Sequence, residues 1–334
     1  MTTTRPPAAR VDAHQQTGSS SRGPLTWLFA LAGAALLTWQ ISTLVRWISR
    51  GHVEPITQFR DETALSWVSA HVFEAVFLAL TIGLVAFIAR NAWRERRFTL
   101  DAMIAVGLLS SAWLDPAFMF YKQIFLYSSQ FINLRAWCGD MPGVLNVQCG
   151  QTPEPLIVPL LYMDVLLAAL LAGWVIRKVR PRFSRWSVWH TVIAAGLVGA
   201  AFDFVMEVPA IYFDLWKYAS GPDLLAPPGL QGANRFSLTT AFTFALITAS
   251  VAALRMHRND RGESLLQRGE TRRIPSRLLS QLAVIGYLQL TVIVSFAPAM
   301  LAAPYAGPWK HYPAQLTNGM CDNNARSSTP YPCT

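Results

Sequence analysis

The chain is poor in charged residues. Only 14% of its 334 residues are Asp, Glu, Lys or Arg, whereas a soluble domain carries about 25%. Hydrophobic residues make up 52% of the chain, and the mean hydropathy is +0.30. This deficit of charge, together with long apolar runs, excludes an ordinary soluble domain and predicts a membrane protein with several spans.

Cysteines and cofactor-binding motifs are also scarce. The four cysteines are too few for a disulfide scaffold and lack the Cys-x-x-Cys spacing of a zinc site. HExxH, P-loop, GxSxG and glycine-rich dinucleotide motifs are absent, which argues against an ATP-driven pump or an oxidoreductase. The last apolar run has no lysine for retinal, and only His71 lies inside a span, where a haem-bearing bundle needs paired histidines. We therefore expect no metal and no cofactor.

Seven segments are apolar enough to cross a bilayer, which takes about 20 residues. They are residues 25–47, 66–89, 100–121, 155–176, 190–212, 236–254 and 278–303. The predicted fold class is an all-α membrane protein with about seven transmembrane helices. A polar, disordered tail is expected over residues 1–23, the transmembrane domain over 24–304, and a cysteine-containing tail over 305–334.

Lysine and arginine are distributed unevenly between the two ends of this predicted bundle. The N-terminal tail and the loops after the second, fourth and sixth spans hold 19 of the 28 basic residues. Because basic loops stay in the cytoplasm, the pattern predicts a cytoplasmic N-terminus, an extracytoplasmic C-terminus and a multi-pass protein of the cell membrane. The same pattern explains the net charge of +9 without a nucleic-acid partner. The lipid bilayer is the expected surrounding.

All four cysteines fall on the predicted extracytoplasmic side, where disulfides persist. Cys138 and Cys149 lie between the third and fourth spans, and Cys321 and Cys333 lie in the C-terminal tail. We expect the local pairs Cys138–Cys149 and Cys321–Cys333, with crossed pairings between the two segments as the open alternative.

Ionisable residues gather in the outer halves of the spans, where each is a functional hypothesis because charge is costly in lipid. They are His71, Glu74, Asp115, Asp164, Asp203 and Glu207. Asp203 and Glu207 lie one helical turn apart and face the same way. Asp115 precedes Pro116, which predicts a break in the third span. Together they predict an acidic cavity that opens outward and is lined by the second to fifth spans.

Paired carboxyls in such a cavity are suited to acid–base chemistry. Two carboxyls close together in a low dielectric cannot both ionise, so one holds a proton beside a carboxylate. The predicted catalytic residues are Asp203, Glu207 and Asp115. The alternative is structural: the acids pair with His71, Lys122, Arg135 or Lys217 and tie helices together.

The predicted outer segments are rich in aromatic residues, among prolines and glycines. One interpretation is an aromatic belt at the membrane interface, and the other is a wall or lid over the cavity. On the second interpretation the candidate pocket residues, besides His71, Glu74 and Asp164, are Trp113, Tyr121, Tyr127, Asn133, Tyr212, Trp216 and Tyr218.

Three stretches carry a resemblance to a known family. They are "RRFTLDAMIAVGLLSSAWLDPAFMFYKQIFLYSSQFINLRAW", "PEPLIVPLLY" and "GAAFDFVMEVPAIYFDLWKYA", with the Trp-x-Asp-Pro of Trp113 to Pro116 and the Asp-x-x-x-Glu of Asp203 to Glu207. Over roughly residues 95 to 255 the chain resembles the avermectin spirocyclase (AveC-like) family of bacterial membrane proteins. The resemblance implies a membrane enzyme of polyketide tailoring that forms a spiroketal from a dihydroxy-ketone and sometimes dehydrates it.

The first hypothesis is therefore a cofactor-independent cyclase/dehydratase, of lyase or isomerase type, acting on a hydrophobic polyketide. The second is a membrane terpene-type cyclase that starts its reaction with a proton, because a DDxxD magnesium motif is absent. The third is a non-catalytic, proton-coupled transporter that uses the acids as a relay.

Overall fold

The structure is a computed structural model that describes residues 23–55, 64–117, 125–128, 130–143, 153–183, 185–218, 236–260, 262–271 and 273–302. Six helices in these ranges are long and apolar enough to cross a membrane. They are α1 (Pro24–Ser49), α2 (Ala64–Glu95), α5 (Val158–Val179), α6 (Val188–Tyr212), α7 (Leu238–Met256) and α8 (Ile274–Ala302). The all-α membrane fold is confirmed. The two predicted tails lie outside the described residues, apart from Gly23.

The third predicted span differs from expectation. The α-helix α3 covers only Leu100–Ser111, and the 3-10 helix η1 (Ala112–Leu114) follows it. The α-helix resumes over residues 115–117, so the 3-10 turn interrupts the helical stretch and does not end it. The break therefore comes before Asp115, which itself has helical backbone angles. Most of α3 is buried, and irregular backbone is tolerated at membrane depth where protein surrounds it.

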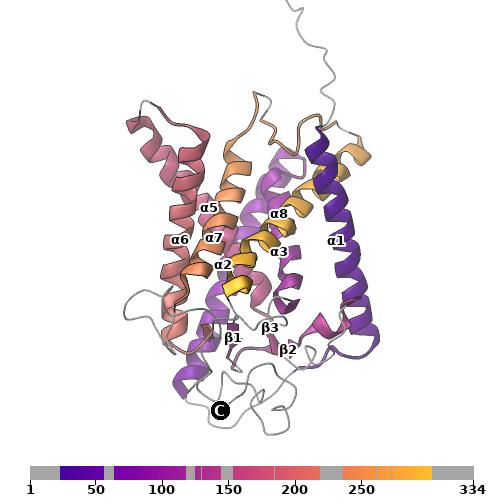
Figure 1. Ribbon diagram of the computed structural model, residues 1–334, viewed down its shortest axis with the longest axis vertical. Helices are drawn as coiled ribbons and strands as arrows, with labels where there is room; N and C mark the ends of the chain where they lie inside the picture. The colour runs from indigo at the N-terminus through magenta and orange to yellow at the C-terminus, as the bar shows by residue number, and fades with distance from the viewer. Residues whose placement is uncertain are drawn as a thin grey trace, which may run out of the picture.

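The helices divide into an inner and an outer group. About half of the residues in the spans of α5, α7 and α8 are buried, against about a fifth in α1, α2 and α6. The short α3 packs against α8, α5 and α2 inside this bundle (Figure 1). Helix α1 lies against α8 at Gly33 and Gly286, where a Cβ on either glycine would overlap the backbone of the other helix. Small residues allow this close approach, as is common between membrane helices.

The two ends of the bundle differ in structure. The loops after α2, α5 and α7 meet at one end, which we call the arginine-rich end (upper end in Figure 1). At the opposite end four short strands and a 3-10 helix form a layer that we call the cap. Strand β1 (Phe125–Tyr127) pairs antiparallel with β4 (Trp216–Tyr218), and β2 (Asn133–Arg135) pairs with β3 (Pro153–Pro155). The basic loops thus share one end, and its assignment to the cytoplasm stays a prediction.

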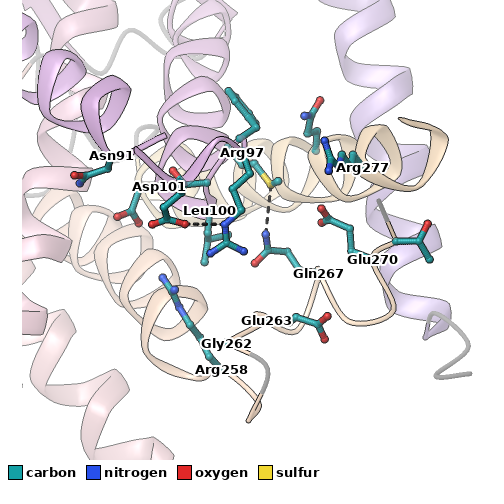
Figure 2. A pocket seen from close by; sticks show the side chains of 16 residues that line it. Asn91, Arg97, Leu100, Asp101, Arg258, Gly262, Glu263, Gln267, Glu270 and Arg277 are labelled. Carbon is teal, nitrogen blue, oxygen red and sulfur yellow. Dashed lines mark hydrogen bonds and ion pairs between the residues drawn. The ribbon is translucent and has the colours of Figure 1, made fainter. Parts of the chain in front are cut away.

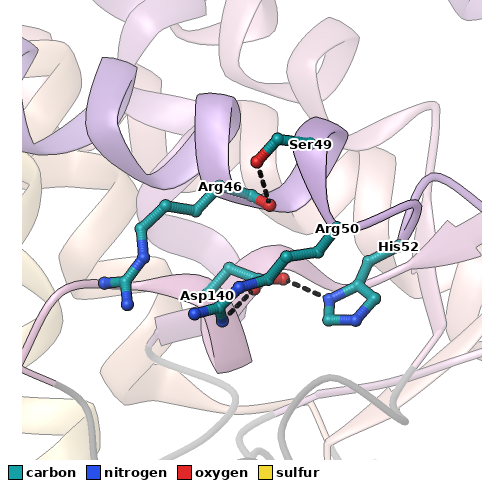
Figure 3. A network of polar contacts seen from close by, with 5 residues as sticks. All are labelled: Arg46, Ser49, Arg50, His52 and Asp140. Atoms are coloured by element: carbon teal, nitrogen blue, oxygen red, sulfur yellow. Dashed lines mark hydrogen bonds and ion pairs between the residues drawn. The ribbon is translucent and has the colours of Figure 1, made fainter.

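The cap is held to the end of α1 by a buried acid. Asp140 of the 3-10 helix η2 (Trp137–Asp140) is 2% exposed and contacts both Arg50 and His52 at 2.8 Å (Figure 3). Beside it the rings of Trp47 and Trp137 pack edge to face, 5.6 Å apart. These contacts fix the position of the cap over the bundle.

Of the four cysteines, only Cys138 lies within the described residues, where its side chain is buried in the cap. Cys149, Cys321 and Cys333 lie outside them. The two predicted disulfide pairs therefore stay predictions.

Candidate active site

A cavity of about 100 Å³ lies between the cap and the inner helices, and three carboxyl groups face it. Asp115 follows the 3-10 turn at the end of α3, whereas Asp203 and Glu207 come from α6. The rest of the lining is mostly aliphatic, aromatic and hydroxyl-bearing: Tyr127, Val158, Leu161, Tyr162, Val165, Trp216, Thr240, Thr243, Phe244, Ile247 and Phe296. The structure thus brings the three predicted catalytic residues together at one cavity.

The two acids of α6 interact directly with each other. Their i, i+4 spacing places both carboxyls on one face of the helix, where they share a side-chain hydrogen bond. Two carboxyl groups form such a bond only when one of them carries a proton. Tyr218 of β4 donates a hydrogen bond to Oε2 of Glu207. Asp203 is only 2% exposed, and its Oδ2 has no hydrogen-bond partner among the described residues, so one acid oxygen is available at the cavity.

Asp115 has a different environment, because two phenols donate to it. The hydroxyl of Tyr127 lies 3.2 Å from Oδ2, and that of Tyr162 lies 3.4 Å from Oδ1. Burial, and then the charges of Asp115 and Glu154, raise the pKa of Tyr127 well above its ordinary value, so this phenol stays a donor. Both donors stabilise the ionised form of this carboxyl group, whereas its burial opposes ionisation.

The three acids have no cationic partner in the part of the chain that the structure describes. None of them forms a salt bridge with a described lysine, arginine or histidine. Lys217, a candidate partner, instead lies 2.7 Å from Asp214 and donates to the carbonyl of Ile211. The structural alternative of ion pairs between helices therefore does not hold for these acids and the described cations, and Lys122 lies outside the described residues.

The prediction that α2 lines the cavity is wrong. His71 stacks on Trp67 with ring centroids 4.3 Å apart, and its Nδ1 lies 2.9 Å from the Trp67 carbonyl oxygen. Glu74 accepts a hydrogen bond from the N–H of Ile132 at 2.8 Å, so it ties α2 to the cap. Helices α7 and α8 take the place of α2, because Thr240, Thr243, Phe244, Ile247 and Phe296 complete the wall. Spacing along α2 shows which residues share a face but not which neighbour that face meets.

The predicted aromatic residues separate into two groups. Tyr127 and Trp216 line the cavity, and Tyr218 reaches it through Glu207. Tyr212 points away and is 74% exposed, as the aromatic-belt interpretation expects. Tyr121 lies outside the described residues.

Three further predicted pocket residues do not line the cavity. The ring of Trp113 packs edge to face on Trp39, and its carbonyl accepts from Trp137 at 2.8 Å. Asn133 is buried in the cap, where its amide donates to the carbonyls of Ser128 and Phe131. Asp164 is buried on α5 but is not among the residues that line the cavity. Trp113 and Asn133 therefore pack within the fold around the site, and none of the three residues forms the cavity wall.

Two polar residues near the site were not predicted from the sequence. Tyr162 lies one turn inside α5 and donates to Asp115. Glu154 of β3 is 3% exposed, and within the described part of the chain its Oε1 has no hydrogen-bond partner. Burial, and then the charge of Asp115, raise the pKa of Glu154 well above its ordinary value. An acid between two prolines in a loop normally lies in solvent, so the sequence carried no sign of its burial.

No group of three or more His, Cys, Asp or Glu residues among the described ranges is arranged to hold a metal ion. The expected independence from metals and cofactors stays a prediction.

Comparison with known proteins adds one finding. A family model described as "Spirocyclase AveC-like" matches residues 95–317, about two thirds of the chain. No curated protein and no solved structure matches the chain. The matched range contains every residue that lines the cavity, whereas α1 and nearly all of α2 precede it.

Proposed function

The chain belongs to the AveC-like spirocyclase family, and we propose that it is a membrane-embedded cyclase that forms a spiroketal from a linear dihydroxy-ketone. One observation carries this proposal: three carboxyl groups face one small, otherwise largely apolar cavity without a described cation to neutralise them. Acid-assisted loss of water needs such groups and no redox partner.

The reaction balances without a co-reactant. The first hydroxyl of the substrate adds to the ketone and forms a hemiketal. A carboxylic acid protonates the hemiketal hydroxyl and the C–O bond breaks. Water departs, and an oxocarbenium ion remains. The second hydroxyl attacks this cation and gives up its proton to a carboxylate. One water is lost overall, and the protein ends with as many protons as it had at the start, one having passed from the acid to the base.

The surroundings of the carboxyls divide these roles. The pair of Asp203 and Glu207 holds a shared proton through its hydrogen bond, so it supplies the acid. We assign the carboxylate role to Asp115, because Tyr127 and Tyr162 donate hydrogen bonds to its two oxygens. This carboxylate steadies the oxocarbenium ion and accepts the proton of the attacking hydroxyl. The neighbouring ring of Trp216 adds an aromatic face, which also attracts cations.

The size of the cavity suits only part of a polyketide. Its volume of about 100 Å³ is below the roughly 300–1,000 Å³ of sites that enclose a drug-sized ligand. The cavity therefore encloses the reacting ketone and its two hydroxyl-bearing arms, and the rest of the substrate stays outside. Confining the arms brings the hydroxyls to the ketone, where proximity supplies much of the rate.

Turnover by the full chain in native membranes tests this function. Membranes with the wild type are incubated with a series of linear dihydroxy-ketones, and mass spectrometry follows a product lighter by one water. We expect the wild type to form it and the double variant Asp203→Asn, Glu207→Gln to lose it. The matched control is Glu263→Gln, Glu270→Gln, which changes two acids that line a cavity at the arginine-rich end.

The outcomes separate the function from its site. A wild type that leaves every dihydroxy-ketone unchanged overturns the proposed reaction. A double variant in α6 that is as active as the control overturns the assignment of the site and leaves the reaction standing.

A further inference from the structure

A second cavity, at the arginine-rich end, has the opposite electrostatic character. Its volume is about 760 Å³, and Arg180, Arg258 and Arg268 line it together with an apolar wall. We propose that this cleft binds an anionic phospholipid, with the phosphate at the arginines and an acyl chain along the apolar wall. This site is independent of the proposed reaction, because it shares no lining residue with the candidate active site.

The first argument is the unbalanced charge of the cleft. No aspartate or glutamate is among its lining residues, and none of the three arginines forms a salt bridge within the described chain. Arg258 donates through Nε to the carbonyl of Arg255 at 2.9 Å, and its two terminal amino groups can donate to an anion. A guanidinium cannot discharge itself by losing a proton. Arg180 and Arg268 line this cleft alone, and Arg258 lies between it and the neighbouring cavity; together they favour an anion from outside the chain.

The neighbouring cavity shows that this imbalance is local. Its volume is about 340 Å³, and its arginines alternate with acids (Figure 2): Arg97, Arg258 and Arg277 with Glu95, Asp101, Glu263 and Glu270. Arg97 pairs with Glu95 at 2.7 Å, for example. The chain thus places acids beside arginines at this end of the bundle, but not in the larger cleft.

The second argument is the depth of the cleft in the bundle. Arg180 directly follows the last residue of α5, and Arg258 comes two residues after the end of α7. Ser187 and Val188, at the start of the 25-residue helix α6, line the same cleft. The ends of spans lie where lipid headgroups lie. The N-terminus of α6 adds its partial positive charge to that of the arginines.

The third argument is the apolar wall, which favours a lipid over a free anion. Phe29 of α1, Leu254 of α7 and Tyr287 of α8 line it, and the rings of Phe29 and Tyr287 pack edge to face 5.3 Å apart. Inorganic phosphate gains nothing from these side chains. The acyl chain of a lipid can pack along this wall, whereas free phosphate has no apolar part to place there.

A competition between lipids tests the site. The full chain is purified in detergent and mixed with equal amounts of phosphatidylglycerol and phosphatidylcholine, and native mass spectrometry counts the lipid retained. We expect phosphatidylglycerol to be retained preferentially. The double variant Arg180→Gln, Arg268→Gln should weaken this binding about thirtyfold, from two cationic contacts. The matched control Arg97→Gln, Arg277→Gln removes two charges from the neighbouring cavity and should leave the binding close to wild type.

Three results overturn the proposal. The first is equal retention of the two lipids by the wild type, which needs no variant to fold. The second is a control variant that binds as weakly as Arg180→Gln, Arg268→Gln. The third is displacement of phosphatidylglycerol by inorganic phosphate at a similar concentration, which identifies a site for free anions instead.

Discussion

The two ends of the bundle differ in the sign of the charged groups that line their cavities without a partner of opposite charge. At the cap, Asp115, Asp203 and Glu207 share a cavity without a described cation. At the arginine-rich end, Arg180 and Arg268 share a cleft without an acid. A carboxyl group becomes neutral by taking a proton, whereas a guanidinium stays charged. On the two proposals made above, the first imbalance holds protons for chemistry and the second attracts an anion.

A third arrangement within the cap makes the contrast sharper. Asp140 is as buried as Asp203, yet Arg50 and His52 lie 2.8 Å from its two oxygens. The charge of this acid is balanced by the neighbouring Arg50, and its contacts join the cap to the end of α1. Burial alone therefore does not distinguish a catalytic acid from a structural one, and the partners do.

The largest effect on the reaction rate is expected when an acid that lines the cavity is replaced, in comparison with a buried acid that does not line it. Asp115→Asn should slow spiroketal formation about a hundredfold or more, because the variant neither stabilises the cation nor accepts a proton. Asp164→Asn changes a buried acid that does not line the cavity, and its rate should stay close to wild type. Product formed per amount of folded protein is the measurement. Equal losses in the two variants would remove the distinction between lining and supporting acids.

Removing a single phenol should have a smaller effect. Tyr127→Phe or Tyr162→Phe takes one donor from Asp115, and we expect about a tenfold loss of rate, as for a hydrogen bond to a charged group. Tyr287→Phe is the control, because this phenol lines the cleft at the other end. The same assay compares the three variants. A slower Tyr287→Phe would mean that the two ends are coupled.

The structural acid should respond in stability rather than in rate. Asp140→Asn weakens the contacts to Arg50 and His52, and we expect a loss of about 1–2 kcal/mol in the free energy of unfolding. Thermal unfolding in detergent measures this loss, and the rate per folded molecule should not change. An unchanged melting temperature with a lower rate would place Asp140 in the chemistry.

The smallest expected effect is that of Glu154 on the pH dependence of the free energy of unfolding. Its pKa is raised in the folded protein, so the folded state binds this proton more tightly than the unfolded state. Wild-type stability from this group is therefore fully present below its ordinary pKa of 4.5 and declines as the pH rises from there toward the folded pKa. The variant Glu154→Gln has no carboxyl group at this position, so its free energy of unfolding should not show this decline.

The measurement compares melting temperatures of the wild type and Glu154→Gln in detergent, from acidic to mildly alkaline pH. The difference should move in favour of the variant as the pH rises. A difference that stays constant over this range would mean that Glu154 is ionised in both states.

Much of the helical framework and part of the site follow from local patterns. Apolar runs of about 20 residues predicted six of the observed spans to within a few residues at most ends. The i, i+4 spacing placed Asp203 and Glu207 on one face, and both do line the cavity. The resemblance carried by Trp113–Pro116 and Asp203–Glu207 also agrees with the family match. These properties depend on helix period and bilayer thickness, which the sequence contains.

Other features depended on which helices become neighbours. Hydropathy continues through the third span, but the 3-10 turn over Ala112–Leu114 interrupts its helix just before Asp115. The spacing of His71 and Glu74 resembled that of the acids in α6, yet their side chains meet Trp67 and the cap instead of the cavity. Nothing in the sequence around Glu154 distinguishes it from a solvated loop acid.

The sequence by itself determined that this chain crosses a membrane and carries acids in spans where charge is costly. It also determined that arginines gather in alternate loops, since hydropathy and charge are properties of each segment alone. Only the tertiary structure decided which acids face one another, which take a cation, and which arginines surround an apolar cleft. Those facts arise from contacts between residues far apart in the chain, such as Asp115 with Tyr162 and Asp140 with Arg50.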